Sequence, residues 1–307
     1  MTAPAPLEQF SPDEVLVHRP RLLGLAYRML GDMDEAEDVV QETYLRWYRA
    51  APEDVRSPEA WLVTAATRLA VDRLRRLKVE RATYPGPWLP EPVPTDAPAA
   101  PAGPPPPDRN AELASDLSIA LLLLLERLGP EERAAFLLRE VFGVDYAEIA
   151  RILERRPDAV RQMVHRARLR VRAERPRATP PPESHEVMLE RFVAAIAADD
   201  APALLSLLAP DVVVATDGGG VARAARNLLH GPDRAARFLL GVARKLGPNV
   251  THRLGHVNGR PALLTLEDGA VVSVTTFDID GDRLRAIYSV RNPAKLRRVL
   301  RDALPIV

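Results

Sequence analysis

Cysteine is absent from all 307 residues of the sequence. A disulfide framework, a cysteine-based zinc site and a thiol nucleophile are therefore excluded. Long apolar runs are missing as well, because the segment from Ile119 to Leu125 is far too short to span a membrane. The first six residues lack the basic and then apolar regions of a secretory signal. We therefore expect a cytoplasmic protein that has no contact with a membrane.

The formal net charge of the chain is zero, because 42 lysines and arginines balance 42 aspartates and glutamates. A neutral chain at first argues against nucleic acid as a partner, but the distribution of charge matters more than its sum. In this chain the arginines are concentrated in particular segments. The sequence shows no internal repeat, and its length suggests two or three domains.

Proline-rich segments divide the chain into separate bodies. Residues 83–107 are rich in proline and alanine and are predicted to form an extended linker. A shorter proline-containing break follows at 176–182. We therefore expect three bodies, at residues 10–82, 108–175 and 184–307.

The spacing of apolar residues predicts the structural class of each body. The first two bodies have helical spacing throughout, with residues 12–30 expected as one helix and another helix beginning at Pro58. The third body begins with amphipathic helices and continues with strand-like runs. Those runs surround three hairpin-turn signals, Asn258-Gly259, Asp268-Gly269 and Asp280-Gly281. The predicted fold is therefore multidomain, with two all-α domains and then an α+β domain that contains an antiparallel sheet.

The strongest local pattern lies in residues 144–172, where a short helix, a tight turn and a longer helix form a helix-turn-helix. One face of the longer helix is apolar and consists of Val160, Val164, Ala167 and Val171. Another face is basic, which suits guanine edges and phosphates. The alternative is an arginine-rich helix that is merely solvated. The candidate base contacts are Arg156, Asp158, Arg161, Gln162 and His165, with Arg166 beside them, and the candidate phosphate contacts are Arg168 and Arg172.

A second basic surface is expected on the helix that begins at Pro58. Aromatic and basic residues together on one helix face suit unstacked bases along a phosphate backbone. Its candidate residues are Trp61, Thr64, Arg68, Asp72, Arg75 and Arg76. The alternatives are that Trp61 belongs to the core and that Asp72 pairs with Arg68 or Arg76 within the helix. The preceding loop, residues 51–57, is a candidate to hold one flipped base.

The helix before that loop carries a face of a different kind. Asp38, Gln41 and Glu42 lie on one side of it, opposite its apolar stripe. An acidic face beside a DNA-binding helix fits a protein partner better than DNA. From spacing alone, a solvated surface explains it equally simply.

These motifs, taken together, resemble those of the extracytoplasmic-function sigma factors of the sigma-70 family. The resemblance covers about residues 10–82 and 108–175 and is carried by residues 36–47 (AEDVVQETYLRW), by 60–62 with 70–76 (AWL, AVDRLRR), and by 146–150 with 160–168 (YAEIA, VRQMVHRAR). It implies that the Asp38 helix binds the β′ clamp of core RNA polymerase, and that the Trp61 surface melts and reads the −10 promoter element. It further implies that the helix-turn-helix reads the −35 element, near the β flap.

Three further segments resemble the sigma factor subgroup that has a SnoaL-like, NTF2-like cone domain at its C-terminus. In that subgroup this domain is thought to regulate the sigma regions of the same chain. The residues of these segments expected to make regulatory contacts are Trp88, Leu89, Pro90, Glu91, Pro92, Asp217, Gly218, Gly219, Gly220, Asn292, Pro293 and Lys295. Val221 stands where the subgroup has a lysine, with Arg223 as a candidate substitute. Trp88, amid prolines, is expected to dock on the third body or on the second.

SnoaL-like cyclases and ketosteroid isomerases use a related cone domain for catalysis, which needs an acid or base in an apolar cavity. The candidate residues are Asp217, His252, His256 and Tyr288. Asp217 precedes three glycines and is expected to be a turn residue, and the two histidines lack an obvious third ligand. We therefore expect no enzyme activity, no cofactor and no metal, but a pocket that can hold a small apolar ligand.

Two other functions compete with the sigma factor interpretation. A one-component regulator with a ligand domain would bind duplex DNA without polymerase, usually as a symmetric dimer. An isomerase or cyclase fused to a DNA-binding module would instead contain a dry pocket with an acid or histidine of shifted pKa. The acidic Asp38 face and the Trp61 surface favour a sigma factor, which we expect to be a monomer when free.

Overall fold

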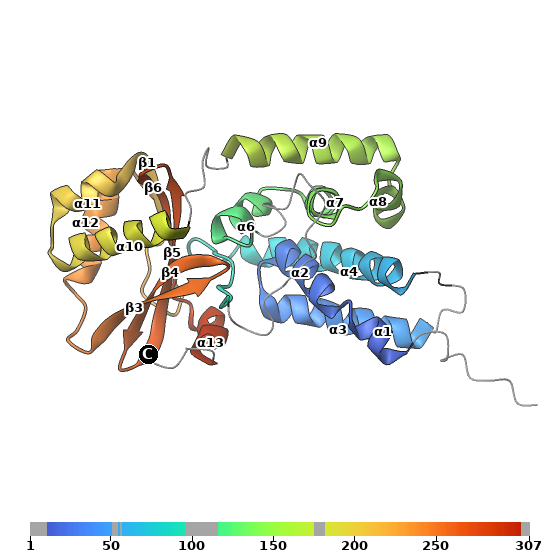
Figure 1. Ribbon diagram of the computed structural model, residues 1–307, viewed down its shortest axis with the longest axis horizontal. Helices are drawn as coiled ribbons and strands as arrows, with labels where there is room; N and C mark the ends of the chain where they lie inside the picture. The colour runs from blue at the N-terminus through green and yellow to red at the C-terminus, as the bar shows by residue number, and fades with distance from the viewer. Residues whose placement is uncertain (1–10, 51–54, 56, 96–115, 175–181, 302–307) are drawn as a thin grey trace, which may run out of the picture. The chain divides into compact units, whose positions relative to one another are not determined.

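The structure is a computed structural model that describes residues 11–50, 55, 57–95, 116–174 and 182–301 (Figure 1). The chain forms two compact units. The first takes in the described residues up to 80, 116–117 and 124–173, and the second takes in 81–95, 118–123 and those from 174 on. None of the described helices is both long and apolar enough to cross a membrane.

Four helices make up the first part of the helical unit: α1 (Pro12–Leu16), α2 (Arg19–Leu30), α3 (Met33–Ala50) and α4 (Pro58–Arg81). The prediction of one helix over residues 12–30 is wrong, because α1 and α2 are separate. Pro20 lies in the first turn of α2 and has no N–H to donate to residue 16, so one helix cannot run through it without losing a hydrogen bond. The start of α4 is as predicted, with the Ser57 hydroxyl accepting a bond from the Ala60 N–H at 3.3 Å.

The helix-turn-helix is present in the same unit. It follows α6 (Ile119–Glu126) and α7 (Pro130–Glu140), and consists of α8 (Tyr146–Leu153) and α9 (Pro157–Glu174). Glu154 turns the chain between them in the left-handed region, at φ 55°. The predicted apolar face of α9 is confirmed, because Val160, Val164 and Ala167 are 0% exposed and Val171 is 4% exposed. The residues of the second body before 116 lie outside the described part of the chain.

The second unit is built around one six-stranded sheet in the order β2-β1-β6-β5-β4-β3. Its strands are β1 (Leu208–Asp217), β2 (Leu229–His230), β3 (Val250–Val257), β4 (Arg260–Glu267), β5 (Ala270–Asp280) and β6 (Arg283–Val290). The three predicted hairpins join β3 through β6 in antiparallel pairs. Asn258 and Gly259 both have positive φ, as a two-residue hairpin turn requires. β1, in contrast, pairs with β6 in parallel.

Helices cover both faces of this sheet (Figure 1). On one face, α10 (Pro182–Ala197), α11 (Ala201–Leu207) and α12 (Pro232–Ala243) pack with the sheet around Phe192 and Phe277. On the other face, α13 (Pro293–Arg301) and Leu89 close a second apolar cluster, in which Leu89 is 1% exposed. This second core therefore includes a residue of the predicted linker.

The described part of that linker is attached to the edge of the sheet. Pro94 forms an antiparallel bridge with Val257. The Thr95 N–H donates to the His256 carbonyl at 3.1 Å, and the Asn258 N–H donates to the Val93 carbonyl at 2.8 Å. Residues 83–95 are thus part of the second unit, whereas residues 96–107 of the predicted linker lie outside the described chain.

Candidate nucleic-acid interface

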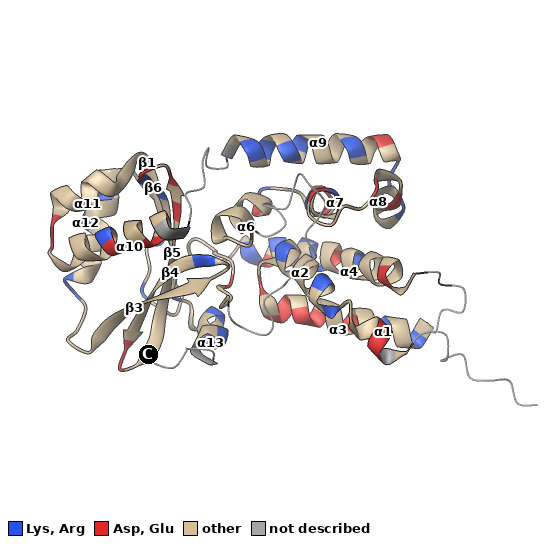
Figure 2. Cartoon of the chain, in the orientation of Figure 1, with Lys and Arg blue, Asp and Glu red and all other residues tan. Residues whose placement is uncertain are grey.

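Basic residues recur along α9 and colour its ribbon blue (Figure 2). Most of the predicted contact residues are exposed: Arg156, Asp158, Arg161, Gln162, His165, Arg166 and Arg172. Arg161 bonds Asp158 at 2.6 Å, but both side chains are more than half exposed, so this pair contributes little stability and leaves the arginine available.

Arg168 differs from these residues. Its guanidinium donates two hydrogen bonds to the Glu140 carboxylate, from Nε at 3.2 Å and from Nη2 at 2.6 Å. The Glu140 side chain is only 6% exposed, so the pair joins α9 to α7 inside the unit. The hydrogen bonds that Arg168 donates to Glu140 raise the pKa of Arg168. Arg168 is therefore held as an internal brace, a role that the spacing of charges did not predict.

The predicted residues of α4 share one side of the helix, but several are already engaged. The Trp61 ring lies edge-on to Trp47 with centroids 5.3 Å apart, and Trp47 is 6% exposed, so the half-buried Trp61 adjoins the core. Thr64 donates its hydroxyl to the Ala60 carbonyl at 2.7 Å. Asp72 pairs with Arg75 at 2.8 Å, and not with Arg68 or Arg76 as the alternative for Asp72 supposed. Asp72 and Arg75 are three positions apart, which makes them neighbours on the helix surface. Arg76 is exposed.

Arg68 and Arg75 reach beyond their own helix. The Arg68 guanidinium donates to the Ile152 and Arg151 carbonyls at 2.9 and 3.1 Å, and also bonds Glu154 at 3.1 Å. Arg75 bonds Glu131 at 2.7 Å. Sequence reasoning missed these acceptors, because spacing within one helix gives no information on the Glu131 carboxylate, 56 residues from Arg75, or the Ile152 carbonyl, 84 residues from Arg68.

Acidic residues colour part of the α3 ribbon red (Figure 2). Asp38 and Gln41 are exposed, and Glu42 bonds Arg46 at 2.9 Å within the helix. Glu35, which was not among the predicted residues, binds Arg73 with both oxygens and so joins α3 to α4. Residues 51–54 and 56 of the loop proposed to hold a flipped base lie outside the described residues.

In the second unit, Asp217 is the buried last residue of β1, beside the glycine turn, and not within a turn as predicted. It caps the glycine turn through the Gly219 N–H at 3.0 Å. Its side chain is 0% exposed and also accepts bonds from the Tyr84 hydroxyl at 2.6 Å, the Leu89 N–H at 3.0 Å and Lys295 Nζ at 2.7 Å. Asp217, at the end of β1, thus joins the linker segment to α13.

Trp88 completes this arrangement. The Arg81 guanidinium lies 3.5 Å from the centroid of its ring and Lys295 Nζ lies 4.2 Å from it, so two cations contact one indole. Lys295 also donates to the Leu89 carbonyl, and Asn292 donates to the Tyr84 oxygen at 2.9 Å. We call Tyr84, Trp88, Asp217, Asn292 and Lys295 the tether cluster. Burial and the neighbouring Asp217 raise the pKa of Tyr84, so its hydroxyl stays protonated and donates its hydrogen bond to Asp217.

The other residues of the three motif segments support the cluster. Leu89, Pro90, Glu91 and Pro92 are buried, and Glu91 lies 3.4 Å from Arg298 of α13, an ion pair that the motif did not predict. A Cβ atom at Gly219 would come within 2.4 Å of the Asn292 amide, which explains the need for glycine there. Gly218 and Gly220 are similarly enclosed, and Pro293 begins α13.

Residues 221 and 223 do not take part in the tether cluster. Val221 is 80% exposed. Arg223 is also exposed, and its carbonyl rather than its guanidinium accepts the bond from Arg291, at 2.8 Å. The expected substitution of Arg223 for a missing lysine therefore finds no support, whereas Lys295 already supplies a cation to Asp217.

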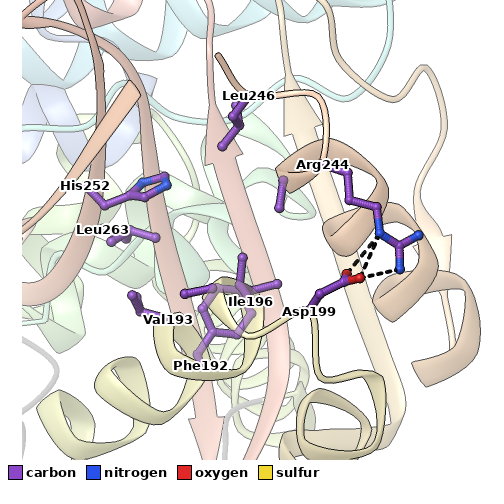
Figure 3. Close-up of a pocket in the computed structure, with 10 residues that line it drawn as sticks. Phe192, Val193, Ile196, Asp199, Arg244, Leu246, His252 and Leu263 are labelled. Atoms are coloured by element: carbon purple, nitrogen blue, oxygen red, sulfur yellow. Dashed lines mark hydrogen bonds and ion pairs between the residues drawn. The ribbon is translucent and has the colours of Figure 1, made fainter. Parts of the chain in front are cut away.

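The catalytic candidates are not gathered at one site. Of the four, only His252 lines the cavity of about 290 Å³ beside α10, and burial lowers the pKa of that imidazole (Figure 3). His256 lies 3.7 Å from Glu186, and Tyr288 packs against the second apolar cluster. The lining residues of the cavity are Phe192, Val193, Ile196, Ala197, Asp199, Ala243, Arg244, Leu246, His252 and Leu263.

Comparison with known proteins covers both units. The sigma-70 region 2 family matches residues 15–79, and the sigma-70 region 4 family matches residues 118–171. The ECF RNA polymerase sigma factor SigJ of Mycobacterium tuberculosis is 36% identical over 288 residues, which cover 90% of each chain. The probable sigma factor SigI of that species is 31% identical over 290 residues, covering 91% of this chain and 92% of the relative.

A solved structure agrees with these relatives. The crystal structure of SigJ matches with a TM-score of 0.72 at 32% identity, covering 94% of this chain and 99% of that one. The match therefore includes the sheet of the second unit as well as the helices of the first. The predicted fold class, two helical sigma domains followed by an α+β cone domain, is confirmed.

Proposed function

This chain belongs to the extracytoplasmic-function RNA polymerase sigma factors, and from that membership we propose which of its surfaces meet polymerase and promoter. Sigma factors bind core RNA polymerase and direct initiation at promoters. We assign duplex −35 recognition to the exposed basic residues of α9 and −10 recognition to α4. The Asp38, Gln41 and Glu42 face of α3 is assigned to the β′ clamp, and the helix-turn-helix to the neighbourhood of the β flap.

The arrangement of α9 is the observation that carries the proposal. Its four apolar residues are buried, while Arg161, Gln162, His165 and Arg166 are exposed on the second helix of a helix-turn-helix. A helix presented in this way enters the major groove, with the residues of its first turns at the base edges. A one-component regulator would share this helix, but the membership of the whole chain in the sigma factor family favours partnership with polymerase.

Transcription with purified components tests the proposal. Core polymerase without any sigma factor should give promoter-specific transcripts only when this chain is added. Glu42→Gln with Asp38→Asn should weaken the pull-down of core polymerase by about 10-fold, as expected for the loss of charged contacts at an interface. The variant Glu190→Gln with Asp211→Asn removes the same charge from exposed residues of the second unit and is the control. Operator binding by the chain alone, without transcripts, would instead favour the one-component regulator.

The tether cluster supports a regulatory function for the second unit. The cluster binds the linker residues Tyr84 and Leu89 to Asp217 of the cone domain. It also holds Trp88 against Arg81, the last residue of α4. A segment fixed in this way cannot move freely between the −10 and −35 domains. The second unit therefore regulates promoter recognition from within the same chain, in the cytoplasm where the polymerase is.

We also propose that the cavity of the second unit holds a small, uncharged apolar ligand. Its apolar lining includes Phe192, Ile196 and Leu263. Its two charged lining residues neutralise each other, because Nε and Nη2 of Arg244 each donate to the Asp199 carboxylate at 2.9 Å (Figure 3). A volume of about 290 Å³ suits a small molecule of up to three rings. The His252 imidazole, neutral at pH 7, offers one polar contact.

Binding of N-phenyl-1-naphthylamine, which fluoresces in apolar surroundings, tests this ligand site. We expect a dissociation constant of about 100 µM for a neutral probe of this size. Ile196→Trp, which fills the cavity, should weaken binding by about 10-fold. Val242→Trp adds the same ring at an exposed position of α12 outside the cavity and is the control. Equal binding by both variants would refute the site.

A further inference from the structure

The basic face of α4 is occupied by acceptors from the helix-turn-helix domain. We propose that Glu131, Glu154, the last carbonyls of α8 and the Leu128 carbonyl, together called the α4 latch, stand in for DNA phosphates and hold the helical unit closed until a nucleic acid displaces them. The proposal rests on the assignment of α4 to the −10 element. It concerns only contacts within the helical unit.

The first part of the latch is the C-terminal end of α8. The last four carbonyls of a helix have no partner within the helix, and the end carries partial negative charge. Arg68 donates to two of these carbonyls, those of Arg151 and Ile152, and to the carboxylate of Glu154 that follows them. A planar guanidinium that reads several closely spaced oxygens is the same arrangement that binds a phosphate.

The second part is Glu131 in the first turn of α7. One of its oxygens accepts from Arg75 at 2.7 Å, and both accept from Arg155 at 3.0 Å. The Glu131 side chain is 22% exposed, so its charge is satisfied chiefly by these two arginines. Arg155 is itself in the turn between α8 and α9, and therefore Glu131 joins that turn to α4.

The third contact is Lys78, one turn further along α4. Its ammonium donates to the Leu128 carbonyl at 2.7 Å, just after α6. Three basic residues of one helix, Arg68, Arg75 and Lys78, thus each reach an acceptor between residues 128 and 154. A chance packing would not be expected to satisfy cations in this way along three turns of the same face.

The exposure of the latch makes it reversible. The Arg68 and Arg75 side chains are about half exposed, at 47% and 52%. Exposed ion pairs contribute little and are screened by salt, so a phosphate backbone that offers many charges can replace them. The closed state is therefore a competitor of DNA for the same cations, not a permanent brace such as the Arg168–Glu140 pair.

The absence of cysteine makes a direct measurement of closure simple. Val79→Cys on α4 and Leu169→Cys on α9, both exposed, place spin labels on the two sides of the latch in the full chain. Pulsed electron resonance should give one narrow distance for the otherwise unchanged protein. Glu131→Gln with Glu154→Gln should move at least half of the molecules to longer distances. The control, Glu190→Gln with Glu267→Gln, removes the same charge from exposed residues of the second unit.

Binding of a fluorescein-labelled single-stranded thymidine 20-mer gives the second readout. The latch variant should bind about 5- to 10-fold more tightly than the control variant, because two arginines are released to bind phosphate. A distance distribution equal to that of the control would overturn the closed state. Longer distances with unchanged binding would overturn the assignment of α4 to single-stranded DNA, and with it the competition, so the two failures are distinguishable.

Discussion

Replacing Lys295 with methionine should lower the free energy of unfolding of the second unit by about 3–5 kcal/mol, the loss typical of a buried ion pair deprived of one partner. The Asp217 side chain is 0% exposed and the Lys295 side chain 7% exposed, so water cannot take the place of the missing ammonium. The substitution also removes the donor to the Leu89 carbonyl and one of the two cations beside Trp88. Urea unfolding followed by tryptophan fluorescence in a Trp47→Phe, Trp61→Phe background, where Trp88 is the one tryptophan left, measures the change.

Two further variants make this result specific. Lys245→Met removes an exposed lysine of the same unit and should change the free energy of unfolding by less than about 0.5 kcal/mol. Asp217→Asn combined with Lys295→Met should recover part of the loss, because no charge is then left buried without a partner. A loss in Lys295→Met no greater than that in Lys245→Met would contradict the central place given to the tether cluster.

Promoter binding should respond strongly to changes on α9. For the double variant Arg161→Ala and Arg166→Ala, the polymerase holoenzyme should bind a −35-containing promoter fragment about 100-fold more weakly, given roughly 1–3 kcal/mol for each good base contact. The affinity should also depend less on salt, with the slope of log K against log salt falling by about 1 for each phosphate that an arginine no longer neutralises. Filter binding at several salt concentrations measures both quantities.

The matched control for that experiment is Arg234→Ala with Arg237→Ala, which removes two exposed arginines from α12 of the second unit. Since this control changes the net charge equally, a general effect of charge on DNA binding would appear in both variants. Equal weakening in the two would show that α9 makes no specific contact. Retention of core polymerase by both variants, checked by gel filtration, excludes loss of the holoenzyme as the cause.

The fold of α9 could be predicted from the sequence because the information lies within one helix. The spacing of Val160, Val164, Ala167 and Val171 determines the buried side, and the arginines on the other side are then exposed. The hairpins of the sheet were predictable for a similar reason. Each turn requires particular residues, such as Asn258 and Gly259 with positive φ, at adjacent positions.

The partners of charged residues were much less predictable. Asp217 was expected to be a turn residue, but it is the last residue of β1 and caps the turn that follows. Its bonds to Tyr84 and Lys295 connect positions 133 and 78 residues apart. Arg68 and Arg75 were assigned to DNA because nothing in their helix indicated Glu154 or Glu131. The wrong prediction of one helix over residues 12–30 has a local cause instead. The apolar spacing continues through Pro20, but the helical hydrogen bonding cannot, because proline has no N–H.

The second apolar cluster has a consequence for the order in which the protein is made. Leu89 and the chain around it leave the ribosome about 200 residues before Lys295 and α13, which cover them, as the Lys295–Leu89 separation of 206 positions shows. Every residue of the helical unit is therefore synthesised before the linker can be secured. During that interval the nascent chain already contains the two helices proposed to read the promoter, while the domain proposed to regulate them is still incomplete.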